Sequence, residues 1–394
     1  MAIGKINSVS LIILFPLLFL SLASYGFAAM NKISIFIIML FLVTQTKKLN
    51  LKMLNIIMAI TIIYIIGLLS LLRSGLFQVN AFVNDSMFLL LFLIVGIMFY
   101  KKVFLNANFE KVFFKFLEWS LYIHIVYIII LFVSGESLFN IDYGQFRFKG
   151  SMGSSATSIF YLALFIPFFT KYMYIKEKKY LLLSIILIVF ILLCGTRITI
   201  LALMFIIMIN IISSISGYKK IIFLMFFIIA SIFIIESITS RLFFNNEVSI
   251  ESLNMSGRNL LWAALIEKIP DSPWFGFGTG STYTYLKIVK PLGGMADDQV
   301  HNDYIKILFN YGYVGLFLFL YTIKNMFNSL IVKKSLFNNL NIKISKNYIY
   351  GFLILMLTDN VLVYMFYIYP FIIYYFFTVE AIRKEIKLEN SIDY

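Results

Sequence analysis

The chain has 394 residues, of which 61% are hydrophobic and only 13% are charged. A soluble globular protein is about 45–50% apolar and about 25% charged. Because a soluble domain of this length cannot bury so much apolar surface, the composition excludes a cytosolic enzyme, a secreted domain and a disordered chain. The net charge of +14 is spread between apolar runs, as in a membrane protein, so nucleic acid is not expected as a partner.

About twelve apolar runs are long enough, or nearly so, to span a bilayer. The sequence therefore predicts an all-α integral membrane protein with a single polytopic domain over residues 1–394. The first run is interpreted as a retained anchor, not a cleaved signal peptide. The predicted spans are 9–29, 33–46, 53–72, 84–100, 114–134, 153–172, 180–195, 198–215, 220–238, 303–323, 348–364 and 366–381.

Lysine and arginine are divided unequally between the two sets of loops. One set holds 22 of them and the alternate set holds 10. The positive-inside rule then predicts that both termini lie in the cytoplasm. It also predicts that the large loop 239–302, between the ninth and tenth helices, is extracytoplasmic, and a connection of this length is expected to be functional.

Five of the six arginines fall on the predicted extracytoplasmic side: Arg73, Arg147, Arg197, Arg241 and Arg258. The planar guanidinium suits phosphate or carboxylate, so the set favours an anionic ligand there, although reaching toward headgroups explains any single arginine equally well. Arg197 lies between two apolar runs with almost no loop, where a charge is costly unless it faces a polar cavity. Arg147 precedes a Gly/Ser-rich stretch whose backbone amides can hold an anion. Arg73 and Arg241 are expected to flank their helices.

Residues 255–302 contain the side chains expected to carry the chemistry. Apolar residues in Asn259–Ile269 follow helical spacing, which predicts an interfacial helix with Arg258 in its first turn. Prolines and glycines over 270–280 then break any helix. Three aromatic side chains can stack on sugar rings, or belong to the aromatic belt of any membrane protein: Trp262, Trp274 and Tyr283.

The segment 297–304 holds three carboxylates and one of the two histidines, at the start of the tenth span. His301 is expected near the membrane surface, where an imidazole exchanges protons near neutral pH. Asp297 or Asp298 can cap the helix, and their spacing to His301 matches no strong metal motif, so no metal is expected. Asp359, inside the predicted eleventh span, is either a functional carboxylate or a paired structural one.

One pattern covers about 145–320: Arg147-x-x-Gly150, Gly195-Thr196-Arg197, Arg258, Trp262, Pro273, Gly276, Gly278, His301-Asn302-Asp303-Tyr304, Gly312 and Gly315. It resembles the signature of the O-antigen ligase/polymerase superfamily. The resemblance implies a membrane glycosyltransferase of the bacterial inner (plasma) membrane that acts on undecaprenyl-diphosphate-linked oligosaccharides. It implies no cofactor, metal or soluble nucleotide sugar. Membrane lipid, a chain-length regulator and a flippase are the further partners expected.

The residues of the pattern are assigned roles on this resemblance. Arg197 and Arg258, supported by Arg147, are predicted to hold the diphosphate and to stabilise the charge that develops as it leaves. His301 is predicted to position or deprotonate the acceptor hydroxyl. Two residues that follow the histidine are predicted to shape the acceptor side: Asn302 and Tyr304.

Three functions fit this reading of the sequence. A polymerase transfers the glycan to the non-reducing end of another lipid-linked repeat unit, whereas an O-antigen ligase passes it to a lipid A core or a protein. The polymerase is favoured because the large loop is modest and no large soluble domain is appended. A transporter or flippase of lipid-linked sugars is the rival from another class, but the sequence has no internal repeat and its polar residues gather in one loop.

Overall fold

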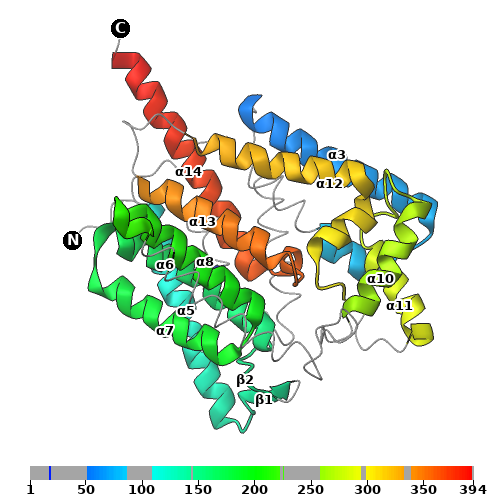
Figure 1. Ribbon diagram of the computed structural model, residues 1–394, viewed down its shortest axis with the longest axis horizontal. Coiled ribbons are helices and arrows are strands. Elements are labelled where there is room, and N and C mark those ends of the chain that lie inside the picture. Colours follow the sequence, from blue (N-terminus) through cyan, green and yellow to red (C-terminus); the bar gives the residue numbers. More distant parts are fainter. Residues whose placement is uncertain are drawn as a thin grey trace.

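The computed structural model describes residues 17–18, 51–86, 109–142, 145–221, 225, 258–293, 299–331 and 339–392. Six of the described helices are long and apolar enough to cross a membrane, so the chain is a helical membrane protein (Figure 1). The elements are α3 (Leu51–Ser74), α5 (Phe109–Val133), β1 (Phe139–Asp142), β2 (Gln145–Phe148), α6 (Ser154–Ile175), α7 (Lys178–Cys194), α8 (Arg197–Ser214), α10 (Arg258–Lys268), η2 (Ile269–Asp271), α11 (Ser281–Gly293), α12 (Asp303–Ser329), α13 (Asn339–Leu355), η3 (Val361–Val363) and α14 (Met365–Ile392).

Most of the predicted spans that fall on described residues coincide with a helix. These spans are 53–72, 114–134, 153–172, 180–195, 198–215, 303–323 and 366–381. Four others lie wholly or largely outside the described residues: 9–29, 33–46, 84–100 and 220–238. The count of about twelve spans and the extracytoplasmic loop 239–302 therefore stay predictions.

The predicted eleventh span, 348–364, is wrong in its position. Helix α13 occupies Asn339–Leu355, and the residues after it form an irregular connection that includes η3 and leads into α14. Polar side chains satisfy the backbone of this connection, since Asp303 Oδ2 accepts the N–H of Leu362 at 2.9 Å. Asp359 therefore lies between two helices and not inside one.

From α5 to α8 and from α12 to α14, consecutive helices alternate in direction, so their ends gather at two opposite ends of the bundle. Helices α6, α8, α12 and α14 begin where α3, α5, α7 and α13 finish, and we call this the loop end because residues 258–293 lie there. The opposite end is rich in lysine, as the 2.6 Å ion pair of Lys179 with Glu118 illustrates. This division matches the two sets of loops that differ in their content of lysine and arginine.

Helices α6 and α14 are the most buried of the candidate spans, and α13 packs against both. Buried polar groups join the three helices. Asn347 Nδ2 donates to Thr170 Oγ1 at 2.9 Å, and the hydroxyl of Tyr348 donates to the carbonyl of Ala163 at 2.7 Å. Such bonds between helices satisfy polar side chains that lipid cannot solvate, so they fix how the three helices pack.

Helix α12 is interrupted at Gly312, whose φ of 66° is not helical. The segment after η2 supplies the hydrogen bonds that this break removes. The N–H of Tyr313 donates to the carbonyl of Pro273 at 2.8 Å, and the carbonyl of Phe309 accepts the N–H of Phe277 at 3.0 Å. The irregular backbone is thus satisfied by protein, which permits it to lie between α3 and α12.

The same segment is held against the end of α3. Gly278 has a φ of 107°, and a Cβ there would lie 2.4 Å from the backbone of Leu71, so only glycine fits. The guanidinium of Arg73 donates to Ser272 Oγ and, at 3.4 Å, to the carbonyl of Gly276. Arg73 does lie at the end of its helix as expected, but there it bonds to protein.

Candidate active site

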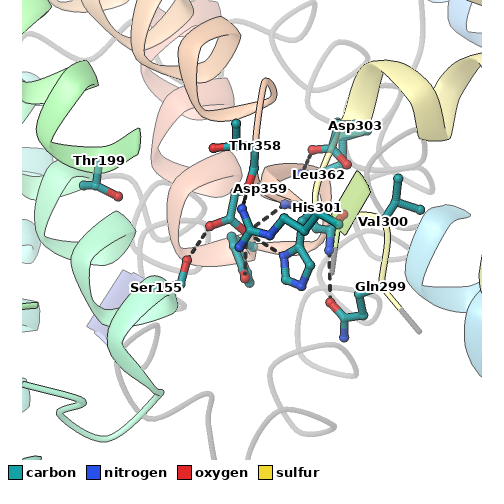
Figure 2. Close-up of polar contacts among 12 residues, drawn as sticks. Ser155, Thr199, Gln299, Val300, His301, Asp303, Thr358, Asp359 and Leu362 are labelled. Carbon is teal, nitrogen blue, oxygen red and sulfur yellow. Dashed lines mark hydrogen bonds and ion pairs between the residues drawn. The ribbon is translucent and has the colours of Figure 1, made fainter. Parts of the chain in front are cut away.

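Five segments meet at the loop end around His301 and Asp359. They are the starts of α6, α8, α10 and α12, together with the connection from α13 to α14. Figure 2 shows Ser155 and His301 approaching Asp359 from opposite sides. The site therefore combines residues that lie more than two hundred positions apart in the sequence, such as Ser155 and Asp359.

The centre of the site is an imidazole beside a buried carboxylate. His301 Nδ1 lies 3.8 Å from Asp359 Oδ1, and the two side chains are 18% and 2% exposed. His301 has a φ of 49°, in the left-handed region that non-glycine residues seldom adopt. A backbone held in such a conformation is a sign that the surrounding structure fixes this residue in place.

Asp359 is held as an anion by its neighbours. Its Oδ2 accepts a hydrogen bond from Ser155 Oγ, and its Oδ1 accepts bonds from the N–H of Asn360 at 2.8 Å and the hydroxyl of Tyr364 at 3.1 Å. Burial alone would raise the pKa of Asp359, but the contacts from His301, Ser155 and the Asn360 N–H outweigh it and lower this pKa below the ordinary value of 3.8. The carboxylate is thus charged throughout the physiological pH range.

The residues after His301 fix the start of α12. Asn302 caps the helix, because its Oδ1 accepts the N–H of Tyr304 and of Ile305, both at 3.0 Å. Its Nδ2 donates to the carbonyl of Leu357 at 3.0 Å, and the hydroxyl of Tyr304 donates to that of Leu353 at 3.1 Å. These polar groups bond to protein, so Asn302 and Tyr304 join α12 to the end of α13 and hold His301 in place.

The capping prediction for Asp297 or Asp298 is corrected by this geometry, since Asn302 is the cap. Asp297, Asp298 and Arg241 themselves lie outside the described residues. Within the described part of the chain, no group of three or more histidine, cysteine or acidic side chains is arranged to hold a metal ion.

Helix α10 confirms that the residues after Arg258 are helical and positions Arg258 at its start, while the place of this helix at the membrane interface stays a prediction. Arg258 Nη1 donates to the carbonyl of Thr358 at 2.8 Å, one residue before Asp359. One turn later, Trp262 Nε1 donates to the carbonyl of Val300 at 2.7 Å, one residue before His301. Both ends of the first turn of α10 are thereby attached to the segments that carry the central pair.

Arg197 begins α8, which is joined to Asp359 through the start of α6. Thr199 and Ser158 share a hydrogen bond of 3.0 Å, and Ser158 Oγ donates to the carbonyl of Ser155, which in turn bonds to Asp359. The N-terminus of a helix favours anions, and here two helices begin beside each other. An anion bound at this place would meet the first turns of both α6 and α8.

Arg147 reaches the same place from β2. Its side chain lies over Gly195, where a Cβ would be 3.7 Å from Arg147 Cγ and Nε. Gly195 precedes Arg197 by two residues, so Arg147 lies against the segment from which α8 begins, although the two arginines are fifty positions apart in the sequence. The three arginines predicted to hold a diphosphate thus come from segments that converge at the loop end.

The remaining two aromatic candidates lie elsewhere. Trp274 is 64% exposed and packs edge-on against Tyr313 with 6.2 Å between ring centroids, roughly 15 Å along α12 from Asp303. Tyr283 lies at the start of α11, beside Thr282, whose N–H donates to Asn310 Oδ1 at 3.0 Å. Contact of Trp274 and Tyr283 with sugars stays a prediction.

Three residues of the site were missed or misplaced by sequence reasoning: Ser155, Asp359 and Tyr364. The sequence does contain a signal for Asp359, because a carboxylate within an apolar run is energetically costly in a membrane. Nothing in the sequence connects Ser155 to it. The pairing depends on how α6 packs against α13 and α14, which one sequence does not reveal.

Residues 182–320 match the family model described as O-antigen ligase. Over these residues the chain is similar to the O-antigen ligase/polymerase superfamily. The O-antigen ligase segment begins in α7, contains Arg197, Arg258 and His301, and ends in α12. Arg147 and Asp359 lie outside it and are brought to it by the fold.

The superfamily consists of membrane enzymes of the glycosyltransferase kind, which serve the synthesis of O-antigen and related polysaccharides. Lipid-linked oligosaccharides are the substrates that this superfamily implies. None of the curated proteins matches the chain.

Proposed function

We propose that the protein is a polysaccharide polymerase that transfers a glycan from undecaprenyl diphosphate to the non-reducing end of another lipid-linked repeat unit. The observation that carries the proposal is the His301–Asp359 pair with Arg258 bonded to the adjacent residue. Transfer to a hydroxyl needs a base, and departure of a diphosphate needs cations nearby. The loop end would then face the outside of the plasma membrane, with both termini in the cytoplasm, and loop 239–302 would contribute to the active site.

The proposed step forms one bond and breaks one. The oxygen of the acceptor hydroxyl attacks the anomeric carbon of the donor sugar as the bond from that carbon to the phosphate oxygen breaks. The bonding electrons leave with undecaprenyl diphosphate, and the proton of the hydroxyl passes to His301 Nε2. Asp359 lies behind Nδ1, so its charge stabilises the imidazolium that forms, as an aspartate does in hydrolase triads. The proton then passes to water.

The arginines act on the leaving group in this proposal. A guanidinium has five N–H donors, so the bond from Arg258 to the Thr358 carbonyl leaves donors for phosphate oxygens. Arg197 approaches from the start of α8 and Arg147 from the second half of β2, and the N-termini of α6 and α8 add partial positive charge. No metal or nucleotide is part of the proposed step.

An O-antigen ligase is the second candidate, because the matching family model carries that description. It would use the same donor and the same residues, but its acceptor would be a lipid A core or a protein. The two functions therefore differ in the acceptor alone, and the test has to vary the acceptor.

The test uses purified protein in vesicles with undecaprenyl-diphosphate-linked repeat units, alone or with a lipid A core. A ladder of polymers from repeat units alone is the expected result. Product only in the presence of the second acceptor would replace the polymerase with a ligase. Movement of the substrate across the bilayer without a new glycosidic bond would replace both with a transporter.

The site assignment is tested separately, by measuring the polymer that cells make when they carry variants of the protein. We expect Arg197→Ala, Arg258→Ala and His301→Ala to abolish polymer at normal membrane levels of the protein. Arg383→Ala is the matched control, because Arg383 lies in the part of α14 far from the loop end and pairs with Glu380. Near-normal polymer from all three site variants would refute the assignment.

A further inference from the structure

The β1–β2 hairpin is amphipathic, and neither the family match nor the proposed reaction accounts for its apolar face. In its antiparallel register Phe139 pairs with Phe148 and Ile141 with Phe146, while Asn140 pairs with Arg147. Residues that pair directly lie on the same face of a hairpin, and successive residues along a strand lie on opposite faces. The first two pairs thus form an apolar face, and Asn140 and Arg147 lie on the other face.

The apolar face is anchored in the protein at one end only. Phe148 is buried, and its ring lies 5.5 Å from that of Phe190 in α7 and 5.4 Å from that of Phe139. Farther along the hairpin, Phe146 stacks on Phe139 at 4.6 Å but is itself 71% exposed, and Ile141 is 74% exposed. Two large apolar side chains therefore project beyond the helices that hold the base of the hairpin.

The contact with α7 fixes the level of the hairpin along the axis of that helix. Phe190 precedes the last residue of α7 by four positions, about 6 Å along the helix axis. The base of the hairpin therefore lies level with the last turn of α7 and not beyond it. In Figure 1 the two strands lie beside the ends of α5 and α7.

The helix surfaces at this level are exposed and apolar. In the last turns of α7, Val189, Leu192 and Leu193 are each about half exposed, and Phe132 and Val133 at the end of α5 are more exposed still. In a membrane protein such surfaces contact lipid. The apolar face of the hairpin continues this surface. None of its four residues is charged: Phe139, Ile141, Phe146 and Phe148.

We propose that the β1–β2 hairpin lies in the interfacial layer of the membrane, with Ile141 and Phe146 inserted among the acyl chains of the lipid. The partner is thus a lipid surface. Transfer of two such side chains from water into hydrocarbon is favourable, and it would hold a short hairpin against the bilayer.

The insertion has a consequence for the active site, which rests on the proposed function. Arg147 lies on the opposite face of strand β2, over Gly195 between α7 and α8. With the apolar face in lipid, Arg147 is held at the depth of the phosphate groups. A lipid-linked diphosphate that arrives in the plane of the membrane meets it there.

Single cysteines carrying an environment-sensitive fluorophore test the insertion in vesicles. The native Cys194 is fully buried, and the unmodified chain measures any labelling of it. We expect the fluorophore on Ile141→Cys or Phe146→Cys to be quenched several-fold more strongly by lipids brominated near the headgroup than by aqueous iodide. Asn140→Cys is the matched control on the opposite face, and brominated lipid should quench it least.

Quenching of positions 141 and 146 by iodide and not by brominated lipid would overturn the proposal. This experiment needs no substrate. If the hairpin inserts into lipid but the protein transfers no glycan, the proposed function is refuted and the insertion is not.

A second experiment compares Phe146→Asp with Phe146→Leu. We expect the aspartate to raise KM for the lipid-linked donor at least tenfold with little change in kcat, and the leucine to leave both unchanged; equal KM values in the two variants would contradict the role given to the hairpin.

Discussion

Replacement of Asp359 by asparagine removes the negative charge behind His301 and changes little else in shape. The amide oxygen can still accept the N–H of Asn360, so the connection between α13 and α14 should keep its course. What is lost is the attraction between the carboxylate and the imidazolium that forms during transfer. The size of that loss depends on the distance between the carboxylate and the imidazole.

The charges are 3.8 Å apart, from His301 Nδ1 to Asp359 Oδ1. With an effective dielectric constant of about 20, full charges at this distance attract by about 4 kcal/mol. If half of the positive charge has developed in the transition state, the loss is about 2 kcal/mol, or a thirty-fold lower kcat. KM should change little, because the interaction is made in the transition state and not with the bound substrate.

The assay is polymer formation by purified protein in vesicles between pH 5 and 8, expressed per folded molecule. A base must be neutral to act, so activity should rise with pH over the range in which histidine titrates. Without the carboxylate the imidazolium is less stable, so the acid limb of Asp359→Asn should move to lower pH. Asp271→Asn is the matched control, since that carboxylate is 56% exposed and pairs with Lys268. A wild-type rate and pH profile for Asp359→Asn would refute the reasoning.

Three further predictions concern Arg258, the cap of α12 and the packing against the end of α3. Arg258→Lys should lower kcat at least tenfold, because an ammonium cannot bond to the Thr358 carbonyl and fork onto phosphate as a guanidinium can; wild-type kinetics would count against the role of Arg258. Asn302→Ala should lower the free energy of unfolding by about 1 kcal/mol through loss of the cap, measured by thermal unfolding in detergent, and an unchanged Tm would contradict the capping geometry. Gly278→Ala should cost about 3 kcal/mol from strain at positive φ and a clash with Leu71, and normal yield and Tm would argue against that close packing.

Helices α10 and α12, and the polar segment that precedes α12, could be predicted from local sequence patterns. Apolar spacing placed a helix after Arg258, and α10 begins there; the prolines and glycines that follow do end it. His301 was expected at a helix start because a polar run meets an apolar one, and α12 begins two residues later. These features depend on residues close in sequence.

The elements that were not predicted depend on contacts between distant residues. The run 348–364 is apolar enough for a span, yet the chain turns within it because Asp303 and Asp359 satisfy its backbone. The break at Gly312 is stable only because the backbone near Pro273 supplies its hydrogen bonds. Neither partner can be inferred from the local sequence.

The β1–β2 hairpin and α11 are intermediate cases. Apolar and polar residues alternate in Phe139–Asp142 and again in Gln145–Phe148, which is a strand signal, but both runs are shorter than most strands and lie between helices. Helix α11 follows the glycines that were expected to interrupt helical structure, and no prediction was made for Ser281–Gly293. In the hairpin, the local strand signal was too short to outweigh the helical pattern of the segments around it.

The central claim is that the site around His301 transfers a glycan from a lipid diphosphate. The most direct measurement counts undecaprenyl diphosphate released per glycosidic bond formed, by the purified wild type and by His301→Ala in the same vesicles. We expect one release per bond for the wild type, and a rate at least a hundred-fold lower for the variant although it still binds the donor. A His301→Ala protein that forms glycosidic bonds at the wild-type rate would contradict the account.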